Sequence, residues 1–316
     1  MTDLLSVDEA RRRIVAMARQ RPPGPVALIE AAGLVLATDE VARRDLPGFD
    51  NSAMDGFAVR AADLAGASDA APARLRLAGE VAAGSVFAGE VEPGTAVRIM
   101  TGAPLPTGAD AVIEVELTSP GAAPGGEGRD AAKDGSRLGA EVLAHARIDP
   151  GRNVRRAGSD IRAGDLALRA GTHLGPYQIA LLAALGAAWP VCIPRPTIAL
   201  LATGDELVDV ADEPGPGQVV NIVGPGLGAA AAMAGAIPFR LGPARDTMDE
   251  LRRSLAGAAT ADVVVSVGGV SMGEYDLVRR AVEEIGELDF WRVAMRPGKP
   301  LAVGGLGGKP FIGLPG

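Results

Sequence analysis

The chain has 316 residues, of which 31 are Lys or Arg and 39 are Asp or Glu, so its formal net charge is −8. This balance excludes a protein that binds nucleic acid through bulk positive charge, and an aromatic content of 3% argues against stacking surfaces for single strands. Because 47% of the residues are hydrophobic, the chain is expected to fold, into two or three domains for its length.

A helix is predicted at the start of the chain. Ser6 and Glu9 have the spacing of a capping box, and Ala10, Ile14 and Met17 follow at helical spacing. No basic segment with an apolar core precedes them, and no apolar stretch reaches the roughly 18–20 residues that span a membrane. We therefore expect a cytoplasmic protein without a membrane partner.

A β-rich region is predicted from about residue 46 to residue 143. Leu75 and Leu77 alternate with polar residues, and a second alternation runs through 113–117. Residues 119–139 are rich in Gly, Ala and Pro without a period, which predicts a surface loop.

Helical and strand patterns alternate in the rest of the chain. The predicted elements are a helix at 176–185 that ends at Gly186, a strand at 196–201, a helix at 227–234, a helix capped by Thr247 and Glu250, a strand at 262–267 and a helix at 277–285. This alternation predicts a parallel α/β sheet with helices on both faces.

The loops after the two buried strands are candidate binding loops, because open parallel sheets bind ligands beyond the carboxyl ends of their strands. The first loop, 202–206, reads Ala-Thr-Gly-Asp-Glu, and the second, 268–273, reads Gly-Gly-Val-Ser-Met-Gly. Glycines before a helix allow backbone N–H groups to approach an anion. Either loop alone is as compatible with a tight turn, but the two together favour a binding site.

Three further loops carry groups suited to ions. Arg296 and Lys299 lie on a stiff turn between two prolines, which suits an oxyanion, although a solvated basic turn is the commoner meaning of such a pair. Asp55, Thr101 and Asp205 offer oxygen ligands suited to Mg²⁺ held together with a substrate phosphate. These residues predict an oxyanion site, with Mg²⁺ as a candidate ion.

Six motifs, taken in order and spacing, resemble the MoeA family of molybdopterin molybdenumtransferases, which is related to the E domains of gephyrin and plant Cnx. They are Asp-Asn-Ser-Ala-Met-Asp-Gly at 50–56, the segment 99–109, Gly-Ser-Asp-Ile at 158–161, Thr-Gly-Asp-Glu-Leu at 203–207, Gly-Gly-Val-Ser at 268–271 and Arg-Pro-Gly-Lys-Pro at 296–300. The resemblance covers nearly the whole chain.

The fold implied by this resemblance is an elongated α/β plus β-rich protein without the family's C-terminal β domain. A MogA/MoaB-like parallel α/β sheet domain, formed by 1–20 and 178–316, would bind molybdopterin. Two smaller, mostly β domains would comprise 21–45 with 143–177, and 46–142.

The function implied by the resemblance is the insertion of molybdenum from molybdate into adenylylated molybdopterin, with Mg²⁺ and with release of AMP. The family's members are homodimers, and a MogA-type adenylyltransferase supplies their substrate. No nucleic-acid partner is expected.

The resemblance also assigns residues to roles. The matching catalytic positions are Asp55, Thr101, Asp160 and Asp205, of which the first three would be presented from the partner subunit and Asp205 would bind Mg²⁺. The matching molybdopterin- and molybdate-binding positions are Thr203, Gly204, Gly268, Gly269, Ser271, Arg296, Lys299 and Pro300.

The sequence departs from the family pattern in two places. Asn221 stands where the family has the Asp of an Asp-Ser-Asn triplet that helps to bind Mg²⁺, and the sequence ends at Gly316, where the family continues with Asn-Pro-Val-Ser and a C-terminal domain. A non-catalytic dimeric scaffold of the same fold is therefore one alternative. A CinA-like nucleotide hydrolase is another, although its second loop would read Gly-Gly-Leu-Gly-Pro-Thr and residues 1–177 argue against it.

Overall fold

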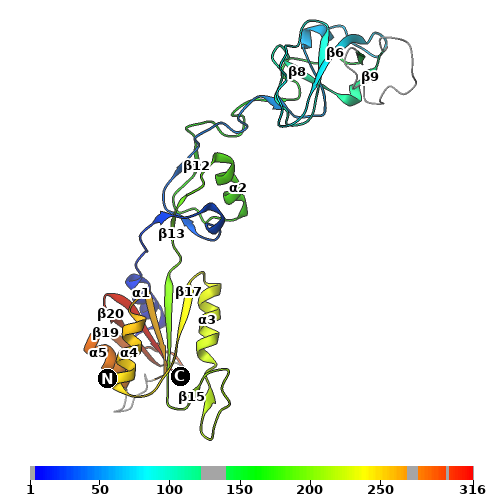
Figure 1. Ribbon diagram of the computed structural model, residues 1–316. Coiled ribbons are helices and arrows are strands. Elements are labelled where there is room, and N and C mark those ends of the chain that lie inside the picture. The colour runs from blue at the N-terminus through cyan, green and yellow to red at the C-terminus, as the bar shows by residue number, and fades with distance from the viewer. Residues whose placement is uncertain (1–3, 122–139, 269–276, 297–298, 316) are drawn as a thin grey trace. The chain divides into compact units, whose positions relative to one another are not determined.

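The computed structural model describes residues 4–121, 140–268, 277–296 and 299–315, and it divides the chain into two compact units (Figure 1). Unit 1 comprises Met1–Thr38, Gly171–Pro176 and Trp189–Gly316, and unit 2 comprises Asp39–Ala170 and Tyr177–Ala188. The three-domain division given above is finer than this one and stays a prediction.

The main sheet of unit 1 has six strands. Their spatial order is β17 (Ile237–Ala244), β14 (Thr197–Thr203), β18 (Val263–Val267), β21 (Lys309–Leu314), β20 (Pro300–Leu306) and β19 (Gly286–Arg292). The first four strands run parallel, but β20 pairs antiparallel with both of its neighbours, so the sheet is mixed rather than wholly parallel. Only two residues join β20 to β21, and so short a connection makes a hairpin.

Helices cover both faces of this sheet, as predicted. They are α1 (Val7–Met17), α3 (Val223–Met233), α4 (Met248–Ala258) and α5 (Leu277–Ile285). Successive residues of β14 point to opposite faces of the sheet, as in any strand. Ala199 and Leu201 belong to the core beneath α4 and α5, whereas Leu200 lies under Gly228 of α3. In Figure 1, α3 lies beside β17, away from α4 and α5.

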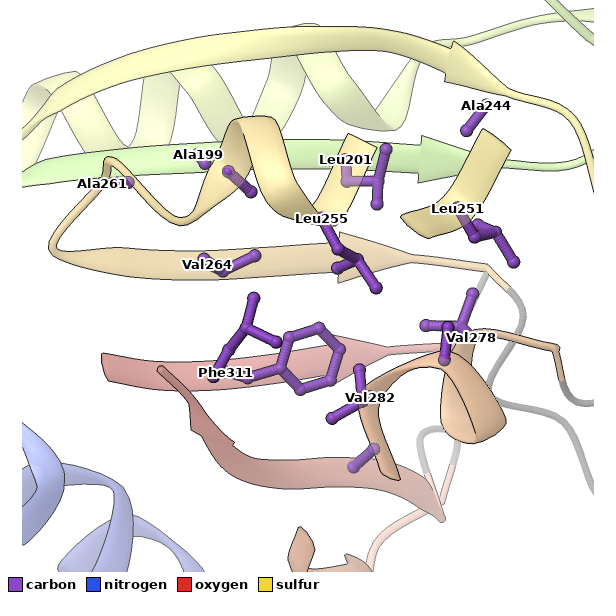
Figure 2. Close-up of a cluster of buried hydrophobic side chains, with 14 residues drawn as sticks. Ala199, Leu201, Ala244, Leu251, Leu255, Ala261, Val264, Val278, Val282 and Phe311 are labelled. Carbon is purple, nitrogen blue, oxygen red and sulfur yellow. The ribbon is translucent and has the colours of Figure 1, made fainter. Parts of the chain in front are cut away.

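The core of unit 1 lies between the sheet and the pair α4 and α5. Side chains from both helices and from the sheet meet there (Figure 2): Leu251, Leu255, Val278, Val282, Val264 and Phe311. On the opposite face, Ala10 of α1 packs with Val293 and Val303. Burial of these side chains stabilises the packing of the helices on the sheet, by roughly 25 cal/mol per Å² of apolar surface.

The predicted helix ends are confirmed in part. The Ser6 Oγ accepts the N–H of Glu9 at 3.2 Å, so the Ser6 half of the predicted capping box is found, whereas the Glu9 carboxylate accepts from Arg12 and Arg13. Helix α2 (Pro176–Leu185) ends before Gly186, whose φ is +77°. The predicted side-chain cap at Thr247 is wrong, because its hydroxyl accepts no N–H of the first turn of α4. Helix α3 starts at Val223, four residues earlier than predicted.

Unit 1 also contains two smaller sheets. One has the order β1 (Gly24–Pro25), β13 (Val191–Ile193) and β2 (Val35–Leu36), and the other pairs β15 (Leu207–Val208) in parallel with β16 (Val219–Val220). Among the described residues, no helix is both long enough and apolar enough to cross a membrane.

Unit 2 is built on a six-stranded sheet, which confirms the predicted β-rich region. Its order is β8 (Ala111–Glu114), β5 (Gly56–Val59), β7 (Thr95–Ile99), β6 (Ala73–Val81), β10 (Glu141–Ala144) and β9 (Thr118–Pro120). Two short ladders join β4 (Asn51–Ser52) to β11 (Val154–Arg155) and β3 (Glu40–Val41) to β12 (Leu166–Leu168). One buried cluster of the unit includes Leu75, Leu77 and Ile113.

Two predictions for unit 2 need correction. The alternation through 113–117 does not continue as a strand, because β8 ends at Glu114 and Val115–Leu117 form a 3₁₀ turn. The N–H of Val115 is bonded to the carbonyl of Asp55, which turns the chain away from the ladder. The predicted loop at 119–139 begins inside β9, and its residues 122–139 lie outside the described residues.

Candidate active site

Two of the predicted binding loops meet at one edge of the main sheet. Thr203 is the last residue of β14 and Gly268 follows β18, and these parallel neighbours have their carboxyl ends at the same edge. A Cβ atom added to Gly268 would lie 2.5 Å from the carbonyl oxygen of Thr203, so the two backbones are in direct contact. The φ of Gly268 is +89°, which also favours glycine.

The cationic turn reaches the same edge by a different route. Because β20 is antiparallel to β21, its first residue, Pro300, lies beside the carboxyl end of β21. Arg296 and Lys299 precede Pro300, and both are exposed. Strands β18 and β21 separate β20 from β14, so Pro300 and Thr203 lie about 14 Å apart along the edge.

A pocket of about 290 Å³ opens between the loop after β14 and the start of α3, and we call it the Thr203 pocket. Its lining residues are Ala202, Thr203, Glu206, Leu207, Val219, Val220, Asn221, Ile222, Val223, Val267 and Gly268. Most of the lining is aliphatic. The pocket is therefore suited to an apolar or flat group with a few polar atoms.

Two buried polar side chains line the Thr203 pocket. Thr203 is 3% exposed, and its Oγ1 has no hydrogen-bond partner within the described ranges. Asn221 is 7% exposed; its Oδ1 accepts the N–H of Gly224 at 3.0 Å, and no bond from its Nδ2 to another described residue is found. A buried polar atom without a partner is costly, so the Thr203 Oγ1 is suited to receive a ligand. The Asn221 Nδ2 is a second group in the pocket that can donate a hydrogen bond.

Three carboxylates gather beside this pocket. Asp205 and Glu206 follow β14, and the Asp205 Oδ1 accepts the N–H of Asp246 at 3.2 Å. The Glu206 carboxylate folds back over the α-carbon of Gly204. Asp246 is not among the residues predicted from the sequence, although it follows β17, which runs parallel to β14 and so ends at the same edge. The alternation of strand and helix would have revealed it if β17 had been recognised as a strand.

The pKa of Asp246 is raised by partial loss of hydration and, further, by the negative charges of Asp205 and Glu206. The native protein therefore binds this proton more tightly than the unfolded chain does. The contribution of protonated Asp246 to the stability of the native protein is fully present below the ordinary pKa of Asp. This contribution is lost as the pH rises through the raised pKa. We expect Asp246→Asn to raise the melting temperature at pH 7 but not at pH 3.

Calorimetric melting of both forms between pH 3 and pH 8 measures this effect. Asp212→Asn, which removes the same charge from an exposed residue nearby, serves as the control. Equal shifts in the two variants would show that net charge, rather than the neighbours of Asp246, is responsible.

Mg²⁺ is the ion implied by the resemblance, and this acidic group fits it in part. Asp205, Glu206 and Asp246 supply carboxylate oxygens, which Mg²⁺ prefers. Within the described part of the chain, however, no group of three or more His, Cys, Asp or Glu side chains is arranged to hold a metal ion. These residues therefore fit Mg²⁺ only in combination with oxygens of a substrate.

In unit 2 the structure brings Asp55 and Thr101 together. The Asp55 Oδ1 accepts hydrogen bonds from the hydroxyl of Thr101 at 2.6 Å and from its N–H at 2.7 Å. These bonds, the side-chain one first, lower the pKa of the exposed Asp55 carboxyl. Asp160 is also exposed, but its carboxylate accepts from Ser159 and is not bonded to Asp55 or Thr101.

The remaining candidate residues are placed only in part. Gly204 is buried and its N–H donates to the carbonyl of Ala244. Gly269 and Ser271 lie outside the described residues. The proposed roles of all these positions stay predictions.

Comparison with known proteins matches nearly the whole chain. The family described as "MoeA N-terminal region (domain I and II)" matches residues 5–186, and the one described as "Probable molybdopterin binding domain" matches residues 199–316. The chain belongs to the MoeA family. The Thr203 pocket lies wholly within the second matched region of this MoeA-family protein.

Relatives with curated names support this membership. Molybdopterin molybdenumtransferase 1 of Mycobacterium tuberculosis H37Rv is 38% identical over 98% of this chain and 73% of its own length. The molybdopterin molybdenumtransferase of Haemophilus influenzae is 35% identical over 99% of this chain and 73% of its own length. The crystal structure of the MoeA protein of Pyrococcus horikoshii shares the fold, with a TM-score of 0.79 and 34% identity over 99% of this chain and 75% of that one. This MoeA-family protein is accordingly a transferase of molybdenum cofactor biosynthesis.

Proposed function

We propose that this protein inserts molybdenum from molybdate into adenylylated molybdopterin and releases AMP. The observation that carries the proposal is the Thr203 pocket, which has aliphatic walls and two buried polar side chains. It lies at the edge of the sheet that also carries the two glycine-containing loops and the cationic turn. Its position within the region matching a molybdopterin-binding domain supports the same substrate.

The ring system of the substrate fits the Thr203 pocket better than a phosphate does. The aliphatic walls favour an uncharged, flat group, and Thr203 and Asn221 can bond the polar atoms at its rim. Glu206 lines the same pocket, and its negative charge would repel a phosphate there.

The anionic parts of the substrates fit the cationic turn. Lys299 and Arg296 are exposed at the same edge, and their charges can bind molybdate, which is a dianion. Pro300 begins β20 and fixes the start of that strand beside the turn. Gly268, which follows β18 at the same edge of the sheet, has no side chain to keep a ligand away from the backbone.

Mg²⁺ would be held by Asp205, with Glu206 and Asp246 beside it, and would supply charge neutralisation for the phosphate groups of the adenylylated substrate. The Asp205 carboxylate is itself oriented by the hydrogen bond that it accepts from the backbone N–H of Asp246. Asp55, held by Thr101 and charged at neutral pH, can act as a hydrogen-bond acceptor for the substrate.

Assembly and context are further parts of the proposal. The family resemblance supports a homodimer in which Asp55, Thr101 and Asp160 are presented to the partner's pocket, a MogA-type adenylyltransferase as the source of the substrate, and a cytoplasmic location. No observation on the described residues favours a non-catalytic scaffold or a CinA-like hydrolase instead.

The proposed function is tested by incubating the protein with adenylylated molybdopterin, molybdate and Mg²⁺. We expect AMP to be released, as measured by chromatography, only when molybdate is present. Asp205→Asn is expected to slow this release. Tight binding of adenylylated molybdopterin without any AMP release would instead support the scaffold.

Asn221 gives a prediction about the metal. Asn221→Asp adds a negative charge to the pocket that Glu206 also lines, and the new carboxylate can still accept the N–H of Gly224, so the start of α3 is kept. We expect Mg²⁺ affinity in the absence of nucleotide to rise by about tenfold. Calorimetric titration with Mg²⁺ measures it, and Asn221→Ala is the control for loss of the amide.

Wild-type protein should bind Mg²⁺ tightly only when adenylylated molybdopterin is also present. Tight binding of Mg²⁺ to the free wild-type protein would mean that other carboxylates complete the site, and the interpretation of Asn221 would be wrong.

A further inference from the structure

Ser52 connects the two loops that carry Asp55 and Thr101. It is one of the few polar residues in the described part of unit 2 that are fully buried, with 0% of its surface exposed. Its hydroxyl donates to the carbonyl of Met54 at 2.5 Å and accepts the N–H of Met54 at 3.3 Å. Both bonds lie within the turn from Ser52 to Asp55, so the hydroxyl closes that turn.

The backbone of the same residue is bonded to the other loop. The N–H of Ser52 donates to the carbonyl of Ala103 at 3.0 Å, and the carbonyl of Ser52 accepts the N–H of Gly102 at 2.8 Å. Thr101 immediately precedes Gly102, whose φ of +81° directs the chain back toward Ser52. The backbone of one buried residue thus bonds directly to the Thr101 loop, next to the β5–β7 ladder that pairs Gly56 with Ile99.

Two further contacts hold the Asp55 turn but do not reach Thr101. The N–H of Ala53 donates to the carbonyl of Asn153 at 2.9 Å, and the carbonyl of Asp55 accepts the N–H of Val115 at 3.2 Å. These bonds fix the turn to neighbouring segments of unit 2. Only the bonds of Ser52 link it, within the described residues, to the segment 101–103 at the level of the backbone.

We propose that Ser52 is the positioning residue for the Asp55–Thr101 pair, because its hydroxyl shapes the turn of Asp55 while its backbone fixes the loop of Thr101. The Asp55 Oδ1 receives both bonds from Thr101, which requires the two loops to keep their register within a few tenths of an ångström. The inference rests on the proposed function only where Asp55 is taken as a reacting group.

The position of Asp55 relative to Thr101 can be measured without substrate. Hydrogen bonds from Thr101 keep the pKa of Asp55 below its ordinary value, so the titration midpoint of its carboxyl carbon in NMR reports the contact. Thr101→Val removes the side-chain bond directly and is expected to move the midpoint upward. Ser52→Ala is expected to move it in the same direction, although the hydroxyl that it removes is bonded to Met54 and to neither Asp55 nor Thr101.

Three comparisons separate positioning from general loosening. Asp50 lies two residues away, and its pKa is lowered first by the N–H of Ala157 and then by Arg156, so its midpoint should stay unchanged in Ser52→Ala. Thr95→Val removes another buried hydroxyl of unit 2, one that donates to Glu92 at 2.8 Å, and should leave Asp55 unchanged. Gly102→Ala strains the Thr101 loop from the other side and should shift Asp55 as Ser52→Ala does.

The proposal is overturned if Asp55 titrates as in the wild type in folded Ser52→Ala while Thr101→Val shifts it. It is also overturned if Asp50 and Asp55 shift together, since that is general loosening. Should Ser52→Ala fail to fold, Gly102→Ala decides by the same criteria. In the AMP-release assay, Ser52→Ala should lower kcat by about tenfold and leave KM unchanged. An Asp55→Asn variant with full activity would contradict the proposed role of Asp55 in the reaction but leave the NMR result standing.

Discussion

Gly268→Ala is expected to destabilise unit 1 by on the order of 3 kcal/mol and to weaken molybdopterin binding by about tenfold or more. The new Cβ would lie 2.5 Å from the carbonyl oxygen of Thr203, and neither atom belongs to a side chain that can rotate away. One of the two strand ends must therefore move. Since Thr203 and Gly268 both line the Thr203 pocket, the movement changes its shape.

The control for Gly268→Ala is Gly235→Ala. Gly235 has the same φ of +89°, but an added Cβ meets no atom within 4 Å. This variant should cost only the backbone strain, about 1 kcal/mol, and leave ligand binding unchanged. Calorimetric melting and titration with molybdopterin measure both effects. Equal melting temperatures for the two variants would show that the contact with Thr203 is relieved without cost.

Lys299→Ala is expected to slow AMP release by about 10²–10³-fold and to change the free energy of unfolding by less than about 0.5 kcal/mol. The side chain is exposed and lies at the sheet edge that carries the candidate site, so its loss removes charge for molybdate but little packing. The assay of AMP release and a thermal melt are the measurements.

Lys309→Ala is the matched control, because Lys309 begins β21 at the opposite end of the sheet and donates to the carbonyl of Ala259 at 2.6 Å. It removes the same charge and should leave AMP release unchanged. A large loss of stability in Lys299→Ala with unaltered molybdate binding would mean that this lysine is structural.

Mixing of variant subunits tests the proposed shared site. Asp55→Asn and Lys299→Ala should each be nearly inactive alone. If each site combines residues of two subunits, a mixed dimer contains one intact site and one that lacks both groups, so mixing restores part of the activity. If the mixture stays inactive, Asp55 and Lys299 act in the same subunit or not in the same site.

The sequence predicted those parts of the fold that depend on local patterns. The cap at Ser6 and the end of α2 at Gly186 follow from residues adjacent in sequence, and both are found. The buried strands after Pro196 and Asp262 were recognised because parallel strands are continuous apolar runs. Their loops were therefore found as well, and Thr203 meets Gly268 as the shared edge requires.

Other features could not be predicted because they depend on pairing between distant segments. Strand β17 contains Gly242 and two prolines and lacks a clear apolar run, so its role beside β14, and with it Asp246, went unnoticed. The 3₁₀ turn at Val115 is fixed by the Asp55 carbonyl, about 60 residues earlier in the chain. The backbone hydrogen bonds of Ser52 with Gly102 and Ala103 also join segments about 50 residues apart in the chain, so local patterns do not reveal them.

The composition of α3, whose first residue lines the Thr203 pocket, favours local opening of this helix. Gly226 and Gly228 each make the helix about 1 kcal/mol less stable than alanine would, and α3 contains no charged residue that could form a stabilising pair along its surface. The helix is therefore held mainly by its contact with β14 and β17. Its amides should exchange with solvent hydrogen before those of α4, and Asn221 and Val223 move whenever the first turn opens. Substrate bound against these residues would slow that exchange. Part of its binding free energy would then offset the entropy lost when the first turn of α3 becomes ordered.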